Sequence, residues 1–352
     1  MAADAIYKVG EINADATQSH SNRNQTFGGA GGTTVHYGAY FLELNGIGYF
    51  VARDGIGHDH DTLWRTDGTP AGTTVVRSLP NQFTNTSTTV RAAVKSGNLL
   101  YYLVGGISGP TSIMRSDGTA AGTYRLADDV FEMADVNGTL YFSTGVGKAL
   151  FKTLGNQDST VNIKNFAGGS ATYLTNASGT LFFSGDDGTN GRELWKSNGT
   201  DANTVMIRNI AQNAGASSNP ARITASGGKA YFVTGGVAGT QLWVSDGTEA
   251  GTLLLINFAD ASNPSPSVKH LTDLNGTLFA FVGGALYANL KIYKSTGTAG
   301  TTVIADPGPF GLGLPASAGE VTVVGDTLYF LAGDRAGSSA SFLYKTSGGV
   351  AA

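Results

Sequence analysis

Seven side chains of types that transfer protons, hold anions or donate hydrogen bonds recur at one position of a repeated unit. Each stands five residues before the first residue of a predicted hairpin turn. These residues, here called the polar row, are Tyr40, Arg91, Glu132, Tyr173, Arg222, His270 and Glu320. A Glu or His can exchange a proton, and an Arg can hold a carboxylate through two parallel hydrogen bonds. We expect the polar row to bind a ligand.

An alternative for the same residues is mutual neutralisation. Arg91 would pair with Glu132 and His270 with Glu320, so that the row holds only water, because charges removed from solvent must be paired. The sequence leaves both interpretations open.

The residue that follows each member of the polar row is apolar. These residues are Phe41, Ala92, Met133, Leu174, Ile223, Leu271 and Val321, counted back from turn residues Asn45, Ser96, Asn137, Ser178, Gly227, Asn275 and Gly325. Because side chains alternate along a strand, the two rows should point to opposite sides. We expect the apolar row to be buried between repeats and the polar row to face a central channel near its mouth.

A weaker candidate is a metal site. His58 and His60 in Gly57-His-Asp-His-Asp61 alternate onto one side of a loop, and His20 or His36 could supply a third ligand for a divalent metal. No helical His spacing or thiolate fixes this geometry, so a solvated polar loop is favoured. The chain has no cysteine, which excludes disulfides, thiolate metal sites and cysteine nucleophiles. We expect no other cofactor.

The elements that position these residues follow from a repeated phrase. Its strongest copies are Leu63-Trp-Arg-Thr-Asp-Gly-Thr69, Ile113-Met-Arg-Ser-Asp-Gly-Thr119, Leu194-Trp-Lys-Ser-Asn-Gly-Thr200 and Leu242-Trp-Val-Ser-Asp-Gly-Thr248. Weaker copies at 150–154, 292–298 and 343–348 make seven, and the aromatic or Met position recurs every 37 to 51 residues. This period indicates a repeat architecture.

One repeat predicts four short strands. In the clearest copy the strands cover 221–226, 229–234, 241–245 and 253–258, separated by glycine-containing turns. Four antiparallel strands of this length make one blade of a β-propeller. We therefore predict an all-β fold in which residues 1–352 form a single domain, a seven-bladed β-propeller of four-stranded antiparallel blades.

Closure of the ring is also predicted. The last repeat lacks its fourth strand, whereas residues 5–12 resemble a strand with no unit before it. We expect this N-terminal strand to complete the seventh blade beside residues 341–347, with 14–35 as a long connection to the first blade. Such a closure removes exposed strand edges.

Two recurrent features are interpreted as structural. Asp67, Asp117 and Asp246 should accept hydrogen bonds within their own turns, since each offers one carboxylate where calcium takes about 6–8 oxygens. Aromatic residues recur at one position of the second strand and one of the third. Recurrence in nearly every unit favours packing between neighbouring blades over sugar stacking.

The repeated phrase, together with Gly-Arg-Glu-Leu-Trp at 191–195 and Asn-Gly-Thr-Leu-Tyr-Phe at 137–142, resembles the ELWxxDGTxxGT (hyalin-like) repeats of bacterial proteins. The resemblance covers essentially the whole chain and implies a β-propeller, often within large exported or surface proteins. It assigns no catalytic residue to any position. The third repeat departs furthest, with Leu154-Gly155-Asn156 in place of Ser-Asp-Gly.

The composition of the chain argues against nucleic acid and membranes as partners. A net charge of −4 and a pI near 5.7 provide no basic field for nucleic acid. No apolar stretch approaches the roughly 20 residues of a membrane helix, and the N-terminus lacks the pattern of a signal peptide. We expect no membrane insertion and, with the resemblance, a secreted or cell-surface bacterial setting.

Three functions remain open, of which the first is favoured. It is a non-enzymatic module that binds a glycan or another small surface ligand. The second is a polysaccharide lyase or glycoside hydrolase at the channel mouth, with Arg91 or Arg222 holding a substrate carboxylate and Tyr40, Tyr173, His270, Glu132 or Glu320 moving protons. The third is a structural domain that docks a protein partner.

Overall fold

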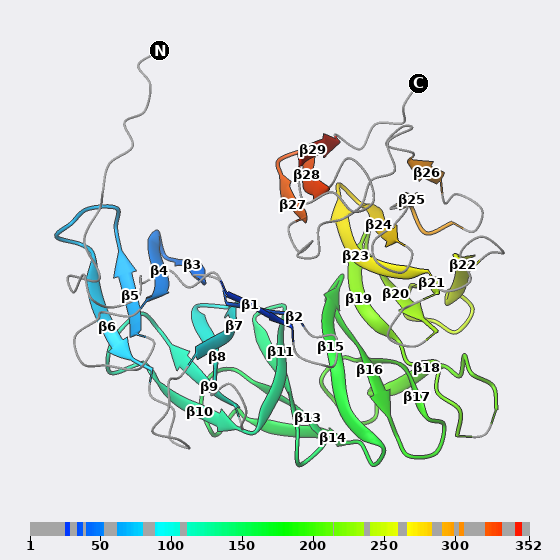
Figure 1. The fold of residues 1–352 in the computed structure, drawn as a ribbon. Helices are drawn as coiled ribbons and strands as arrows, with labels where there is room; N and C mark the ends of the chain where they lie inside the picture. Colours follow the sequence, from blue (N-terminus) through cyan, green and yellow to red (C-terminus); the bar gives the residue numbers. More distant parts are fainter. Residues whose placement is uncertain are drawn as a thin grey trace. The chain divides into compact units, whose positions relative to one another are not determined.

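Twenty-nine β-strands and no helix make up the described part of the chain (Figure 1). The computed structural model describes residues 25–28, 34–37, 40–52, 62–79, 89–105, 111–213, 215–235, 240–259, 266–283, 291–298, 303–305, 321–332 and 342–346. Two compact units divide the chain, residues 1–162 and 163–352, and each is described by itself. None of the described residues form a helix that is long and apolar enough to cross a membrane.

Unit 1 holds three four-stranded antiparallel sheets, in which strands follow one another in chain order. The first sheet has β3 (Phe41–Leu44), β4 (Ile47–Ala52), β5 (Thr62–Thr66) and β6 (Thr74–Ser78). The second has β7 (Thr89–Ser96), β8 (Leu99–Gly105), β9 (Thr111–Ser116) and β10 (Tyr124–Asp128). The third has β11 (Val130–Val136), β12 (Thr139–Thr144), β13 (Ala149–Thr153) and β14 (Val161–Asn165), and the unit boundary falls within β14.

Unit 2 repeats the same order. The fourth sheet has β15 (Gly169–Ala177), β16 (Thr180–Asp186), β17 (Arg192–Ser197) and β18 (Val205–Arg208). The fifth has β19 (Ala221–Ser226), β20 (Lys229–Thr234), β21 (Gln241–Ser245) and β22 (Leu253–Asn257). The sixth has β23 (Ser267–Leu274), β24 (Thr277–Gly283), β25 (Lys291–Ser295) and β26 (Val303–Ala305). The seventh has β27 (Val321–Val324), β28 (Thr327–Ala332) and β29 (Phe342–Thr346).

The predicted four-stranded repeat is therefore confirmed. Its first hairpin is closed by a two-residue turn such as Asn137-Gly138, whose φ angles are 52° and 80°. Both values are left-handed, as in the turn type whose twist matches that of paired strands. Asn tolerates this region and Gly occupies it freely, which explains the recurrent Asn-Gly pair.

Sheets within a unit contact their neighbours through their first strands. In unit 1, β7 contacts both β3 and β11, and in unit 2 the contacts run from β15 through β19 and β23 to β27. A first strand that lies against the first strands of adjacent sheets is the arrangement expected of propeller blades. The first strands are therefore the elements that carry the polar row together.

The recurrent aromatic residues pack as predicted. Phe183 on β16 lies directly opposite Trp195 on β17, with stacked rings 6.4 Å apart, and both side chains are buried. The same cross-strand pair recurs as Phe232 with Trp243 at 6.2 Å. Such pairs stabilise a sheet through contact between opposed side chains. Phe232 and Trp243 also belong to one core cluster with Phe182 and Leu194 of the fourth sheet, so they pack between neighbouring sheets as predicted.

Two predictions concern the chain's first residues. The N-terminal strand at 5–12 lies outside the described residues, and among these the seventh sheet has three strands. The connection predicted at 14–35 contains a structure that was not expected. Its strand β1 (Gln25–Gly28) pairs antiparallel with β2 (Thr34–Tyr37), and β2 contacts β7. Short β-prone segments on both sides of a glycine run were the signal for this hairpin.

Candidate functional site

The polar row lies where the first strands are irregular. Pairing with the second strand shifts register between Val90 and Ala92 on β7, between Val130 and Glu132 on β11, and between Val268 and His270 on β23. Similar shifts occur on β15 and β19. A β-bulge inserts an extra residue and changes the direction of neighbouring side chains. Simple alternation therefore does not decide which way the polar row points.

In the second sheet the structure corrects the predicted alignment. Strand β7 ends at Ser96 and β8 begins at Leu99, so the first turn residue is Gly97. Ala92 takes the place that Glu132 holds in the third sheet, and Arg91 is the extra residue of the bulge. Ser96 was predicted as the first turn residue, and its Ser-Gly sequence at 96–97 is the same as that of the hairpin turn at 178–179. Arg91 therefore lies one residue before the position on β7 that corresponds to Glu132 on β11.

In unit 1 the structure joins two of the predicted residues. The hydroxyl of Tyr40, just before β3, donates a hydrogen bond to the backbone carbonyl of Arg91 on β7. Glu132 lies on β11, opposite Ser143, and all three side chains are half-buried. The contacts of β3 and β11 with β7 thus bring Tyr40, Arg91 and Glu132 onto adjacent strands.

In unit 2 two members of the row adopt a left-handed backbone. Tyr173 on β15 has φ of 57° and Arg222 on β19 has φ of 52°. Non-glycine residues occupy this region at a cost, and such strain gathers at sites where a side chain is turned from its regular direction. Thr175 donates to the carbonyls of Tyr173, at 3.0 Å, and Ile223, at 2.9 Å, so it ties the two bulged strands together.

His270 on β23 packs edge-on against Phe281, with ring centroids 6.2 Å apart. Lys269 precedes it and is the extra residue of that bulge. Burial, followed by the positive charge of Arg222, lowers the pKa of Lys269. Sequence reasoning missed Lys269 because regular alternation placed it in neither row.

The ion pairs among the described residues do not include the predicted pair of Arg91 with Glu132. They join Lys95 to Glu43, Arg115 to Asp117, Arg125 to Asp128 and Lys164 to Asp201. Within the described ranges, Arg91 and Arg222 belong to none of these pairs. Glu320, the proposed partner of His270, lies outside the described residues.

Three aromatic side chains are exposed at or next to the polar row. Phe41 is 63% exposed, Phe131 is 50% exposed and Tyr173 is 38% exposed. Phe41 was predicted to be buried, and this was wrong: it lies on β3, at the edge of the first sheet, and its ring stacks only on Phe50 of its own sheet among the described ring contacts, at 6.0 Å. Ile223 and Leu271 of the same apolar row are buried, as predicted.

The predicted metal ligands lie outside the residues whose side chains are described. His58 and His60 lie outside the described residues, as does His20, and for His36 only the backbone of β2 is described. The ranges whose side chains are described contain no group of three or more His, Cys, Asp or Glu residues that could hold a metal ion.

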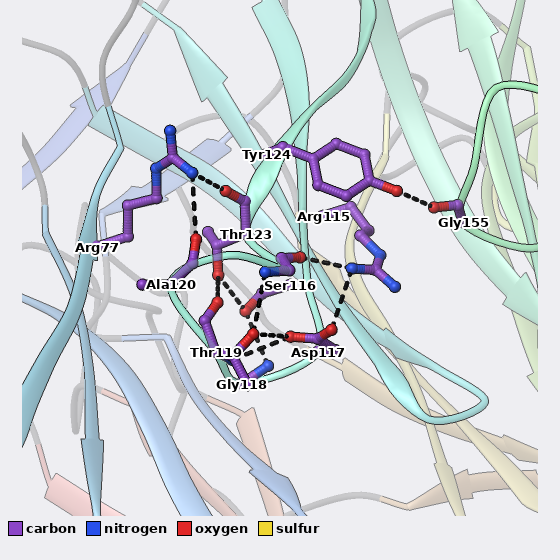
Figure 2. A network of polar contacts seen from close by, with 11 residues as sticks. Arg77, Arg115, Ser116, Asp117, Gly118, Thr119, Ala120, Thr123, Tyr124 and Gly155 are labelled. Atoms are coloured by element: carbon purple, nitrogen blue, oxygen red, sulfur yellow. Dashed lines mark hydrogen bonds and ion pairs between the residues drawn. The ribbon is translucent and has the colours of Figure 1, made fainter.

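The Asp-Gly-Thr turns are structural, as predicted. Asp117 accepts hydrogen bonds from the backbone N–H of Thr119 at 3.0 Å and from its hydroxyl at 2.7 Å (Figure 2). Arg77 of the preceding sheet donates to the carbonyls of Ala120, at 3.1 Å, and Thr123, at 2.5 Å, on the same turn. The repeated phrase thus builds a self-contained turn and fastens neighbouring sheets.

Sequence reasoning missed a buried carboxylate that shapes the connection before β19. Glu193 on β17 is fully buried and accepts hydrogen bonds from the backbone N–H groups of Ile210 at 3.2 Å, Ala211 at 3.1 Å and Ser218 at 3.2 Å. The hydroxyl of Ser218 also donates to it. The Glu of the Gly-Arg-Glu-Leu-Trp segment therefore holds the connection that leads to Arg222.

Comparison with known proteins supports the fold and assigns no function. No protein-family model matches the chain, and no curated protein matches it by sequence. Among solved structures, a prolyl endopeptidase matches with a TM-score of 0.54 and 12% identity, over 87% of this chain and 49% of its own. Prolyl oligopeptidase B from Galerina marginata matches with a TM-score of 0.51 and 14% identity, over 84% of this chain and 47% of its own.

The chain spans about half the length of these two structures. At such low identity the likeness concerns the fold alone, which is all-β and propeller-like.

Proposed function

We propose that this protein is a non-enzymatic ligand-binding propeller whose ligand is a glycan. One observation carries the proposal: exposed aromatic rings and charged side chains occur together on the first strands of contacting sheets. Phe41 and Phe131 are exposed in unit 1 and Tyr173 in unit 2, next to Arg91, Glu132 and Arg222 in sequence or across contacting strands.

These two kinds of side chain suit a saccharide. The apolar face of a sugar ring can lie flat on an aromatic ring, which offers a large, rigid surface at low entropic cost. Hydroxyl groups around the sugar's edge then need a few oriented polar partners, which Arg, Glu and Tyr supply. In β11, β15 and β19 a bulge lies at these side chains and changes the local direction of the strand while the rest of the sheet stays packed.

The architecture proposed for this site is a closed seven-bladed ring. In it, the strand at 5–12 supplies the fourth strand of the sheet formed by β27, β28 and β29. This closure would protect the edge of β29. A secreted or cell-surface bacterial protein is the setting that accords with the resemblance of its repeats.

A glycan array followed by calorimetry on each hit tests the proposal. Phe41→Ala, Phe131→Ala and Tyr173→Ala should each weaken binding of the best saccharide about 10-fold or more, which corresponds to about 1.4 kcal/mol. Leu154→Ala is the matched control, because Leu154 is equally exposed but lies in the third sheet's turn between β13 and β14. Absence of saccharide binding, or equal loss in the control, would reject the proposal.

A further inference from the structure

The first strands of the fourth and fifth sheets carry the same bulge at the same place. On β15, Tyr173 and the residue after it together oppose one residue of β16, and on β19, Arg222 and the residue after it oppose one residue of β20. Tyr173 has φ of 57° and Arg222 has φ of 52°. Each stands five residues before its hairpin turn, and the two strands contact each other. Tyr173 and Arg222 therefore occupy equivalent positions on adjacent strands.

A threonine ends each of these bulges and holds its backbone. The hydroxyl of Thr175 donates to the carbonyl of Tyr173 at 3.0 Å, and the hydroxyl of Thr224 donates to the carbonyl of Arg222 at 3.0 Å. A hydroxyl that bonds a carbonyl two residues away offers the backbone an alternative to regular strand pairing. The side chains of the sequence itself thus fix both left-handed residues.

Thr175 also joins the two bulges to each other. Its hydroxyl donates to the carbonyl of Ile223 on β19 at 2.9 Å, and Ile223 directly follows Arg222. A threonine hydroxyl has one proton, so the carbonyls of Tyr173 and Ile223 share it in a three-centre hydrogen bond. The positions of Tyr173 and Arg222 relative to each other therefore depend on one side chain.

The two residues that Thr175 joins have complementary chemistry. Tyr173 is 38% exposed, and Arg222 is half-buried. An aromatic ring offers a flat surface to the apolar face of a sugar, whereas a guanidinium donates hydrogen bonds and so requires oxygen acceptors. Because both backbones are already fixed, a ligand that contacts both side chains orders little else when it binds.

We propose that Tyr173 and Arg222 form one saccharide subsite across the fourth and fifth sheets, with Thr175 as the positioning residue that sets its geometry. This inference rests on the proposed glycan-binding function. One sugar unit lies with its apolar face on the Tyr173 ring, and its oxygens accept hydrogen bonds from Arg222. Thr175 acts through the backbones of both bulges and does not contact the sugar.

Calorimetry on the intact chain tests the role of Thr175. The probe is whichever of cellohexaose, chitohexaose and a hexamer of galacturonic acid binds most tightly, or the tightest saccharide from the array if none of them binds. Thr175→Val keeps the size of the side chain but removes its hydroxyl, and it should weaken binding about 5-fold or more, which corresponds to about 1 kcal/mol. Thr175→Ser keeps the hydroxyl and should bind within about twofold of the unaltered protein.

A double-mutant cycle separates positioning from a general loss of stability. In the Tyr173→Ala background, Thr175→Val should change the affinity by less than about twofold, because Arg222 alone has no second group to be aligned with. The same should hold in the Arg222→Gln background, where Tyr173 is alone. An equal loss in all three backgrounds would mean that Thr175 does not act through this pair, and the subsite would be wrong.

Thr272→Val is the matched control. Thr272 holds the same place on β23 as Thr175 on β15, three residues before the hairpin turn, and its hydroxyl bonds no other residue that the structure describes. It should leave the affinity unchanged. An unchanged affinity in Thr175→Val, or the same loss in Thr272→Val, would overturn the subsite while glycan binding stands. No binding of any probe or arrayed saccharide would remove both proposals.

A second measurement uses the unaltered protein, so it does not depend on the folding of a variant. During titration with the same probe, the NMR signals of the Tyr173 ring and of the Arg222 side-chain N–H group should shift along one binding curve with a common Kd. The side-chain N–H signals of Arg208 should stay in place, because Arg208 donates to the carbonyl of Thr252 at 2.7 Å from the outer strand β18. A response from only one of Tyr173 and Arg222 would overturn the shared subsite.

Discussion

Replacing Gly251 with Ala should destabilise the fifth sheet through a clash with one identifiable side chain. A Cβ atom at residue 251 would lie 2.1 Å from Oδ1 of Asp246 and 2.2 Å from its Cγ and Oδ2. The backbone there is not left-handed, so an Ala would be tolerated if the carboxylate were absent. The methyl group and the Asp246 carboxylate cannot occupy this space together.

The expected cost follows from what the displaced carboxylate gives up. Asp246 accepts hydrogen bonds from the N–H of Thr248 at 2.8 Å and from its hydroxyl at 2.7 Å. Hydrogen bonds to a charged group contribute about 1.5–3 kcal/mol each when buried, and water replaces part of this at an exposed turn. Gly251→Ala should therefore lower the free energy of unfolding by about 1–3 kcal/mol.

A double-mutant cycle isolates the clash. Asp246→Ala alone should cost a similar amount, because it removes the same hydrogen bonds. Asp246→Ala with Gly251→Ala should be no less stable than Asp246→Ala, since the obstacle is gone and Ala in place of Gly restricts the unfolded chain. Denaturant unfolding followed by tryptophan fluorescence suits the measurement, as Trp243 lies in the same sheet. Additive effects of the two substitutions would refute the reasoning.

The chain's own repeats agree with this coupling. A Gly stands five residues after Asp67, Asp117 and Asp246, and in the first two cases the added Cβ would also lie within about 2 Å of the carboxylate. In two repeats both positions are replaced: Asn203 follows Asn198, and Ser159 follows Leu154. Asn203→Ala therefore serves as the control and should change stability by less than about 0.5 kcal/mol.

Three further outcomes are expected. Glu193→Ala should lower the free energy of unfolding by about 3 kcal/mol, because it leaves one buried and two half-buried N–H donors without their acceptor, at roughly 1–3 kcal/mol for a buried one and less for the others. Amide hydrogen exchange should speed up at Ile210, Ala211 and Ser218, and unchanged protection there would contradict the role of Glu193. The hydrogen bonds from Thr248 hold the pKa of Asp246 below its ordinary value. This carboxylate should therefore add stability above about pH 4 and lose that contribution as pH falls through its folded-state pKa. An NMR titration that gives Asp246 a pKa at or above its ordinary value would contradict this prediction. If the N-terminal strand closes the seventh sheet, a cysteine introduced along 5–12 should form a disulfide with Lys345→Cys, since the chain has no cysteine of its own. Lys8→Cys and Ile6→Cys are the first two positions to test. Failure of every position along 5–12 would argue against closure.

Local chemistry accounts for most of what could be predicted. The Asn-Gly hairpins, the Asp-Gly-Thr turns and the opposed aromatic residues such as Phe183 and Trp195 depend on residues close in sequence or on period-two alternation, and all were confirmed. The hairpin β1–β2 was missed, although its signal was present. Glu193 was missed because a buried Glu is recognised only when its donors, 17 to 25 residues away, are seen around it.

The sequence by itself determined the repeat, the four-stranded antiparallel sheets and the composition of the polar row, because turn residues and strand periodicity act over a few residues. Only the tertiary structure decided the alignment of that row and the exposure of the residues next to it. Bulges arise from how a first strand pairs with its neighbour, and they moved Arg91 out of line and made Lys269 the extra residue of β23, while Phe41 is exposed on a strand that pairs regularly. A one-residue shift is invisible in composition, yet it decides which side chain a ligand meets.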